Sequence, residues 1–180
     1  MPTWEERQAD EAQVRRRWDR QGVLDGCGPV GEAMVRVVDA IPNLDRPRAE
    51  ALEAAYWSTR EAAEAAGVVE AWERAFAYTA AFPDHPGDLY AIDPWSRVAF
   101  SYVGLLAREQ AWALGAGEIG IVPLERTAMG AVLALSVELA GRQGWYHPVS
   151  EELAGWLARP WRQALGSAVT GQGVTADGGG

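Results

Sequence analysis

The sequence predicts an all-α protein, an irregular bundle of six to seven helices with two nearly all-apolar helices at its centre. Three observations lead to this prediction. Helix-starting caps and prolines recur along the chain, the apolar residues between them repeat at helical spacing, and no useful length of sequence alternates as a half-buried strand would. We expect a single helical domain over residues 1–165 and a disordered Gly-rich tail over residues 166–180.

The first predicted helix runs from Thr3 to Gly22. Thr3 and Glu6 have the spacing of a capping box, in which each side chain accepts a hydrogen bond from the other residue's backbone amide. The apolar stripe of this helix is thin and contains few large residues. Residues 1–22 are therefore expected to form a peripheral arm that docks through a small number of anchors.

A short second helix should end before Pro42, and a long third helix should begin at Asn43 or Asp45 and end at Gly67. One face of the third helix is apolar and the opposite face is charged. Trp57 falls in the middle of the charged face. The charged residues around it are Glu50, Glu53, Arg60, Glu61 and Glu64.

Two later helices, predicted over 93–114 and 123–144, are apolar around most of their circumference, which is typical of helices buried at a centre. A shorter helix over 69–82 precedes them, and residues 118–122 between them are expected to be a short extended piece. The solvent-facing strip of the second central helix is expected to contain Thr127, Ala131, Ala134, Glu138 and Arg142. Ser150 should cap a last helix that continues through Pro160 to about residue 165.

The composition bears on location and partners. The formal charge is −9, with 25 acidic residues against 16 basic residues that are all arginine. This balance disfavours binding to nucleic acid or to an anionic membrane. The start of the chain lacks the apolar core of a secretory signal, and the longest nearly apolar stretch, 128–140, is too short to span a bilayer. With Cys27 as its single cysteine, the chain is expected to be cytoplasmic, without membrane or nucleic-acid partners.

The common signatures of cofactor and metal sites are missing from the sequence, so we expect neither a cofactor nor a metal. His85 stands in a loop beside carboxylates only, which is typical of a solvated turn. Cys27 precedes Pro29 in a Gly-rich turn. It would be a reactive thiolate only if it faced the free amides of a helix start.

Polar residues on apolar arcs are the stronger clue. Glu109 and Glu125 project among apolar residues of the two central helices, and a buried carboxylate needs a partner. Either an arginine (Arg97, Arg108 or Arg126) neutralises each of them, or they are polar anchors of an aromatic-lined pocket. The candidate binding residues are Trp57, Glu109, Trp112, Glu125, Tyr146 and His147.

Three functions fit these features. The favoured one is a non-catalytic helical protein that binds a partner protein, a second copy of itself or a small apolar ligand. The second is a small cofactor-independent lyase, cyclase or isomerase with an aromatic-lined pocket and one carboxylate, Glu109 or Glu125, of raised pKa. The third is the ligand-binding domain of a regulator. Clustering of both carboxylates in one enclosed cavity would favour the enzyme, and a continuous exposed apolar patch around Trp57 would favour the binding protein.

Trp57 can be explained in two ways. The arm lies across the charged face, so that Trp4 or Trp18 stacks near Trp57 and an arginine of the arm pairs with the glutamates. Alternatively, Trp57 is open to solvent and anchors a partner, because tryptophan is among the residues most enriched in such anchors.

Overall fold

The computed structural model describes residues 3–18, 24–77, 93–115 and 118–166. It confirms the all-α prediction, since 86% of the described residues are helical, in seven helices without any strand among them. The helices are α1 (Trp4–Trp18), α2 (Gly28–Ala40), α3 (Arg46–Ala65), α4 (Val69–Ala75), α6 (Asp93–Ala113), α7 (Glu118–Gln143) and α8 (Glu151–Leu165), with short 3-10 turns on either side of α2. The predicted disordered tail and the loop with His85 lie outside the described residues, apart from Gly166.

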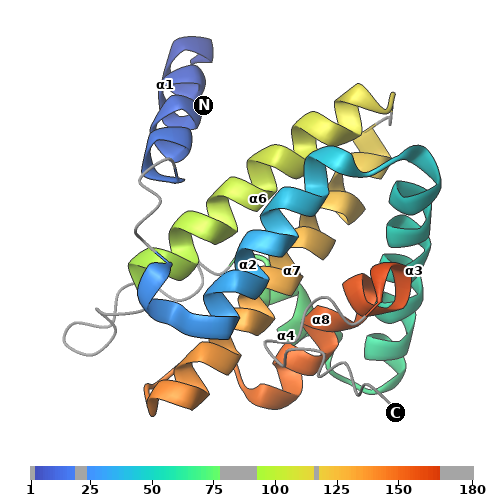
Figure 1. Ribbon diagram of the computed structural model, residues 1–180. Coiled ribbons are helices and arrows are strands. Elements are labelled where there is room, and N and C mark those ends of the chain that lie inside the picture. The colour runs from blue at the N-terminus through green and yellow to red at the C-terminus, as the bar shows by residue number, and fades with distance from the viewer. Residues whose placement is uncertain (1–2, 19–23, 78–92, 116–117, 167–180) are drawn as a thin grey trace, which may run out of the picture.

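Helix α7 lies at the centre of the bundle and packs against α2, α3, α6 and α8. In Figure 1 it runs behind α2 and beside α6, with α3 and α8 on its other side. Helices α6 and α7, the two helices expected at the centre, make the most extensive contact between helices of the described chain. Val103 and Leu106 of α6 and Leu133 and Leu135 of α7 are all buried, which confirms the predicted core.

The N-terminal part of α7 differs from the prediction. Residues 118–122 are not extended but form the first turns of the helix, and Pro123 lies inside it. Proline removes only its own amide from the helical hydrogen bonds, so packing can hold the helix together on both sides of it. The apolar run before Pro123 was too short to distinguish a strand from a buried helix by its pattern.

The predicted solvent strip of α7 is also wrong over most of its length. Thr127, Ala131 and Ala134 are buried, and the Thr127 hydroxyl donates to the Pro123 carbonyl at 2.7 Å. Only Glu138 and Arg142, near the end of the helix, reach the surface, where they form an ion pair at 2.8 Å. Over residues 130–137 the neighbouring helices leave α7 no solvent-facing side, and its small residues there let those helices approach closely.

Residues Gly120–Gln143 of α7 are long and apolar enough to cross a membrane, judged by length and composition alone, and the most apolar 18 residues among them have a mean hydropathy of 1.3. This corrects the expectation that no apolar stretch reaches that length. In the folded chain 61% of the most apolar part of this segment is buried. Packing against four other helices is a sufficient reason for its composition.

The predicted caps are present. The Thr3 amide donates to the Glu6 carboxylate at 2.7 Å, and the Glu6 amide donates to the Thr3 hydroxyl at 3.2 Å, which completes the capping box. The Asp45 carboxylate accepts a hydrogen bond from the Arg48 amide at 3.0 Å at the start of α3. Ser150 caps α8 in the same way.

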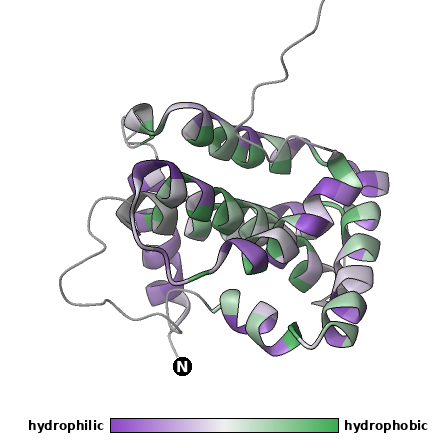
Figure 2. Cartoon of the chain, turned by 90° about the horizontal axis from the view of Figure 1, so that it is seen from below, coloured by the Kyte–Doolittle hydropathy of each residue, from purple (hydrophilic) through white to green (hydrophobic). Residues whose placement is uncertain are grey.

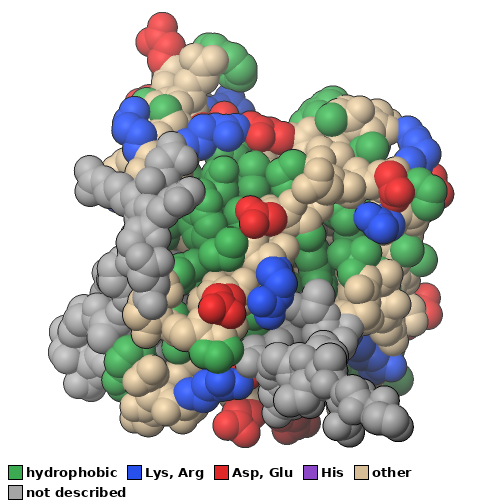
Figure 3. All heavy atoms as spheres, viewed as in Figure 1, with side chains coloured by type: hydrophobic (Ala, Val, Ile, Leu, Met, Phe, Trp, Pro, Cys, Tyr) green, Lys and Arg blue, Asp and Glu red, His purple; other side chains and the backbone are tan. Residues whose placement is uncertain are grey.

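Helix α1 forms the expected peripheral arm, and none of its residues is buried. It packs against α6 and stands apart from the rest of the bundle (Figure 1). Trp18 stacks on Tyr102 with ring centroids 5.1 Å apart, and Arg15 pairs with Glu109. The arrangement in which the arm lies across the charged face of α3 is therefore wrong. Hydrophobic side chains gather over α2 and α6 beside the arm (Figure 3).

Hydrophobic residues dominate the helices that run through the middle of the bundle, whereas hydrophilic residues lie mainly on the outer turns (Figure 2). Two tryptophans, Trp72 of α4 and Trp161 of α8, are among the largest fully buried side chains. These two of the nine tryptophans are thus core residues, and the exposed ones need a separate explanation.

Candidate functional site

The charged face of α3 surrounds an exposed indole. The Trp57 side chain is 42% exposed, and its neighbours one turn away along the helix are Glu53, Arg60 and Glu61. Glu50 and Glu64 continue the same stripe in the two directions. Arg60 is engaged by Glu73 at 3.0 Å and by Glu64 at 3.9 Å. Within the described part of the chain, Glu53 and Glu61 form no ion pair.

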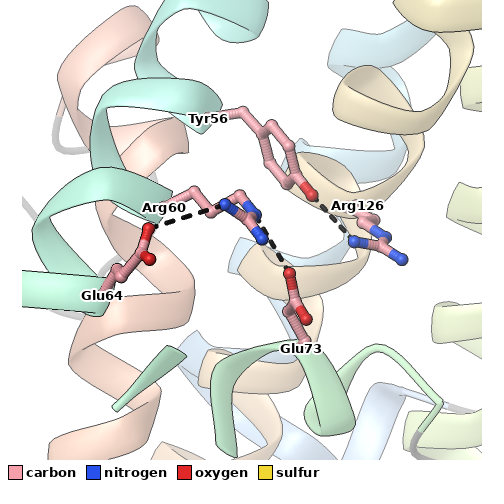
Figure 4. A network of polar contacts seen from close by, with 5 residues as sticks. All are labelled: Tyr56, Arg60, Glu64, Glu73 and Arg126. Carbon is pink, nitrogen blue, oxygen red and sulfur yellow. Dashed lines mark hydrogen bonds and ion pairs between the residues drawn. The ribbon is translucent and has the colours of Figure 1, made fainter. Parts of the chain in front are cut away.

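Beneath Trp57, a network of aromatic and polar contacts holds the surface of α3 in place. The Trp57 ring meets the edge of the Tyr56 ring, with centroids 4.9 Å apart. Tyr56 is buried, and its hydroxyl accepts a hydrogen bond from Arg126 of α7 at 2.8 Å. Figure 4 shows Arg60 turned toward Glu73 and Glu64, beside the contact between Tyr56 and Arg126. Trp57 therefore lies beside side chains that are held by contacts with α4 and α7.

A cleft of about 260 Å³ lies between α1, α6, α7 and the end of α4. Its apolar lining includes Phe76, Phe100, Leu105 and Met129, and its polar lining includes Asp10, Glu11, Ser101, Arg108 and Glu125. Glu125 is the only one of the candidate binding residues in this lining. The cleft thus combines apolar side chains with a comparable number of polar ones, so a ligand there would need both an apolar part and a polar or charged group.

Glu125 is the more deeply placed of the two carboxylates on the central helices. Its oxygen lies 3.7 Å from Arg108, one of the arginines that the sequence suggested as partners. Burial raises the pKa of Glu125, and the charges of Arg108 and Arg126 oppose that rise. The carboxylate is thus a partly desolvated group at the wall of an open cleft.

Glu109 does not join Glu125. Its side chain is 48% exposed, and its partner is Arg15 of the arm rather than an arginine of the central helices. Glu109 was expected among apolar residues, but the arm covers this side of α6: Arg15 pairs with Glu109, and Trp18 stacks on Tyr102, two turns away on the same side. The two carboxylates therefore do not share one enclosed cavity.

His147 lies at the junction of α7 and α8 beside Ser136, a contact that the sequence did not indicate. The Ser136 hydroxyl donates to the Leu133 carbonyl at 2.7 Å and lies 2.9 Å from His147 Nε2. The Val149 amide donates to Nδ1 at 3.0 Å, so the proton of neutral His147 belongs on Nε2 and points at Ser136. This orientation is the reverse of a nucleophilic serine, whose hydroxyl would donate to the imidazole. His147 connects two helices and does not activate Ser136.

The ionisation of His147 is expected to make stability depend on pH. Burial lowers the pKa of His147 from 6.5 to about 4. Between these values the unfolded chain binds the proton more readily, so the contribution is complete above pH 6.5 and is lost as the pH falls toward 4. Urea unfolding should give a free energy about 2 kcal/mol lower at pH 5 than at pH 7 from this group alone.

His147→Gln provides the control, because glutamine can donate to Ser136 but does not titrate. The pH dependence of its unfolding should be smaller than that of the wild type by about the same 2 kcal/mol. Identical pH dependence of the two proteins would show that the folded state does not suppress protonation of His147.

Trp112 and Tyr146 lie on the surface, away from the cleft lining. Trp112 is 65% exposed near the end of α6, and Tyr146 is 62% exposed in the connection between α7 and α8. Before Tyr146, the chain leaves α7 through Gly144, which has a φ of 70°, and the Trp145 amide returns to the Ala140 carbonyl at 2.8 Å. The candidate binding residues are thus distributed over several surfaces.

Cys27 is not set up as a nucleophile. It occupies the N-cap position of α2, as the thiolate hypothesis required. However, burial raises the pKa of its thiol, which disfavours the thiolate at neutral pH. Among the described residues no three His, Cys, Asp or Glu side chains are grouped so that they could hold a metal ion.

Some residues of these sites were missed in the sequence. Glu73 and Arg126 support the face of α3, but both lie far from it in sequence, and no local pattern connects them. Gly104 lines the cleft from the middle of α6. A signal for Gly104 did exist, because a glycine inside a strongly apolar helix usually has a packing or functional reason.

The sequence matches no protein-family model, and it has no significant match among curated proteins or solved structures. Functional inference therefore rests on the chemistry of these sites.

Proposed function

We propose that this chain is a non-catalytic helical protein that binds a partner protein through the face of α3 centred on Trp57. The observation that carries the proposal is the 42% exposure of the Trp57 side chain among glutamates, with the N-terminal arm packed against α6. A large aromatic ring gains little from a solvated position, whereas it is a common anchor at the centre of a protein interface.

The support beneath Trp57 favours binding. Tyr56 is buried and held by Arg126, and Trp72 packs against it with ring centroids 5.1 Å apart. Arg60 is held by Glu73. A surface whose anchor is already ordered loses less conformational entropy on association, which leaves more of the interaction energy for affinity.

The charge of the face indicates the kind of partner. Glu53 and Glu61 stand beside Trp57 without an ion pair in the described residues, and the whole chain has a net charge of −9. These charges favour a partner with a basic surface and an apolar pocket or side chain for the indole. A second copy of this chain would place like charges opposite one another, so self-association through α3 is disfavoured.

The enzyme alternative lacks the feature that would favour it. Glu109 is paired with the arm and Glu125 lines an open cleft, so the two carboxylates do not converge. The regulator alternative requires a small-molecule site. The cleft lined by Glu125 is a candidate for such a site.

The proposal can be tested by selecting peptides from a displayed random library against the folded protein. We expect peptides rich in arginine and lysine with at least one apolar side chain. Trp57→Ala should weaken their binding about thirtyfold or more, the effect of a central anchor. It should lower the free energy of unfolding by only about 1 kcal/mol, because the ring is only partly buried.

Trp112→Ala is the matched control, since it removes an exposed indole from α6 and should leave binding unchanged. Replacing Glu53 and Glu61 with glutamine should weaken binding mainly at low salt. If the selected peptides bind Trp57→Ala as tightly as the wild type, or if this variant loses several kcal/mol of stability, Trp57 is a structural residue.

A further inference from the structure

We propose that the cleft between α1, α4, α6 and α7 binds a small organic cation with an apolar body. The proposal is independent of the α3 face, because the two sites share no residue of their surfaces. It rests on the shape of the cleft, on the glycine that keeps it open and on the distribution of charge around it.

The cleft is large enough for a small molecule. Its volume of about 260 Å³ corresponds to about nine water molecules, just below the usual range of ligand pockets. Phe76, Leu105 and Met129 provide apolar contacts from three different helices or their ends. The methionine sulfur and the aromatic ring are surfaces that adapt well to a compact apolar group.

Gly104 contributes to the open space. It lies in the interior of α6, where glycine is a poor helix former. A Cβ atom at this position would stand 3.4 Å from Met129 Sδ and 3.5 Å from Glu125 Oε1, which are ordinary contact distances. Close packing therefore does not require glycine here. Any longer side chain would extend into the cleft that these residues line.

The arginines around the cleft already have partners. Arg108 lies 3.7 Å from Glu125, and its Nε also donates to the Gly104 carbonyl at 3.4 Å. Arg126 donates to the Tyr56 hydroxyl and lies over the Phe76 ring, 5.3 Å from its centroid. Arg108 and Glu125, which both line the cleft, offset each other's charge, whereas Arg126 lies outside the lining.

The opposite wall is acidic. Asp10 and Glu11 of α1 line the cleft, and neither forms an ion pair with a described residue. Arg15, one turn beyond Glu11, is occupied by Glu109. Among the described residues that line the cleft, the one arginine, Arg108, is engaged by Glu125, whereas Asp10 and Glu11 are available to an incoming ligand. This distribution of charge favours a cation over an anion.

The test compares probes of one shape and three charges: phenethylamine, 2-phenylethanol and 3-phenylpropanoate. Each is titrated into the full-length isotope-labelled chain and followed by backbone amide chemical shifts. We expect phenethylamine to bind roughly five- to tenfold more tightly than the alcohol and the carboxylate to bind least. The shifts should concentrate around Gly104 and Met129.

Two kinds of variant locate the binding. Gly104→Leu should weaken both the amine and the alcohol about tenfold by filling the cleft, whereas Gly104→Ala should leave them within about twofold. Asp10→Asn with Glu11→Gln should abolish the preference for the amine and retain binding of the alcohol. Glu61→Gln with Glu64→Gln removes the same charge from α3, away from the cleft lining, and should leave the affinities of the three probes unchanged.

The exposed position of Asp10 and Glu11 keeps the test valid even if Gly104→Leu does not fold. Any of three results would overturn the proposal. The three probes could bind with equal affinity, the chemical shifts could change away from the cleft, or the Asp10 and Glu11 double variant could keep the full preference for the amine.

Discussion

Trp161→Ala should lower the free energy of unfolding by about 3–5 kcal/mol. Trp161 is 1% exposed on α8, at the side of the bundle where this helix packs against both α3 and α7. Truncation removes a large apolar surface from the core and leaves a cavity that three packed helices can close only in part. The loss is measured by urea unfolding, in which the slope of the free energy of unfolding against urea concentration should be the same for both proteins.

Two further variants define the cause. Trp112→Ala removes an indole that is 65% exposed and should cost at most about 0.5 kcal/mol. Trp161→Phe should cost less than about 1.5 kcal/mol, because the indole N–H of Trp161 has no acceptor in the described part of the chain. Similar losses of stability in Trp161→Ala and Trp112→Ala would mean that the burial of Trp161 does not cause the loss.

Gly130→Ala is the second substitution with a large expected effect. Gly130 lies in α7 where α8 comes closest, and a Cβ atom there would stand 2.7 Å from the Leu157 carbonyl oxygen. That contact is with backbone, so the two helices would have to separate. We expect a loss of about 1–3 kcal/mol from this strain, although alanine is the better helix former by about 1 kcal/mol.

Gly104→Ala is the matched control on the neighbouring helix. Its Cβ atom would meet only side-chain atoms at ordinary contact distance, so the helix propensity of alanine should dominate. The variant should be neutral or more stable by up to about 1 kcal/mol. If both substitutions stabilise the protein, the close approach of α7 and α8 at Gly130 does not limit stability.

The starts of α1, α3 and α8 could be predicted because their cause is local. Thr3 with Glu6, Asp45 before Pro47, and Ser150 each satisfy backbone amides within three residues. Such contacts form in the same way wherever the helix later packs. The burial of Leu133 and Leu135 was likewise readable, since an apolar circumference requires neighbours whatever their identity.

The sites depended on contacts between residues far apart in the chain. The sequence showed that Glu109 needs a partner, but not that Arg15 would reach it from the arm. It showed a histidine among aromatic residues, but not that His147 would meet Ser136. Periodicity assigns a residue to a face of its own helix and contains no information about which helix covers that face.

By itself, therefore, the sequence determined the helical class, the helix caps, the buried leucines of the central helices and the charged stripe around Trp57. Only the tertiary structure decided that the arm packs against α6, that Trp57 is left exposed, and that Glu125 and Gly104 line a common cleft. The physical reason is the distance along the chain over which the interactions act. Helix caps and the apolar or charged faces of a helix follow from residues within one or two helical turns. The position of the arm depends instead on which distant surfaces offer Trp18 and Arg15 their partners.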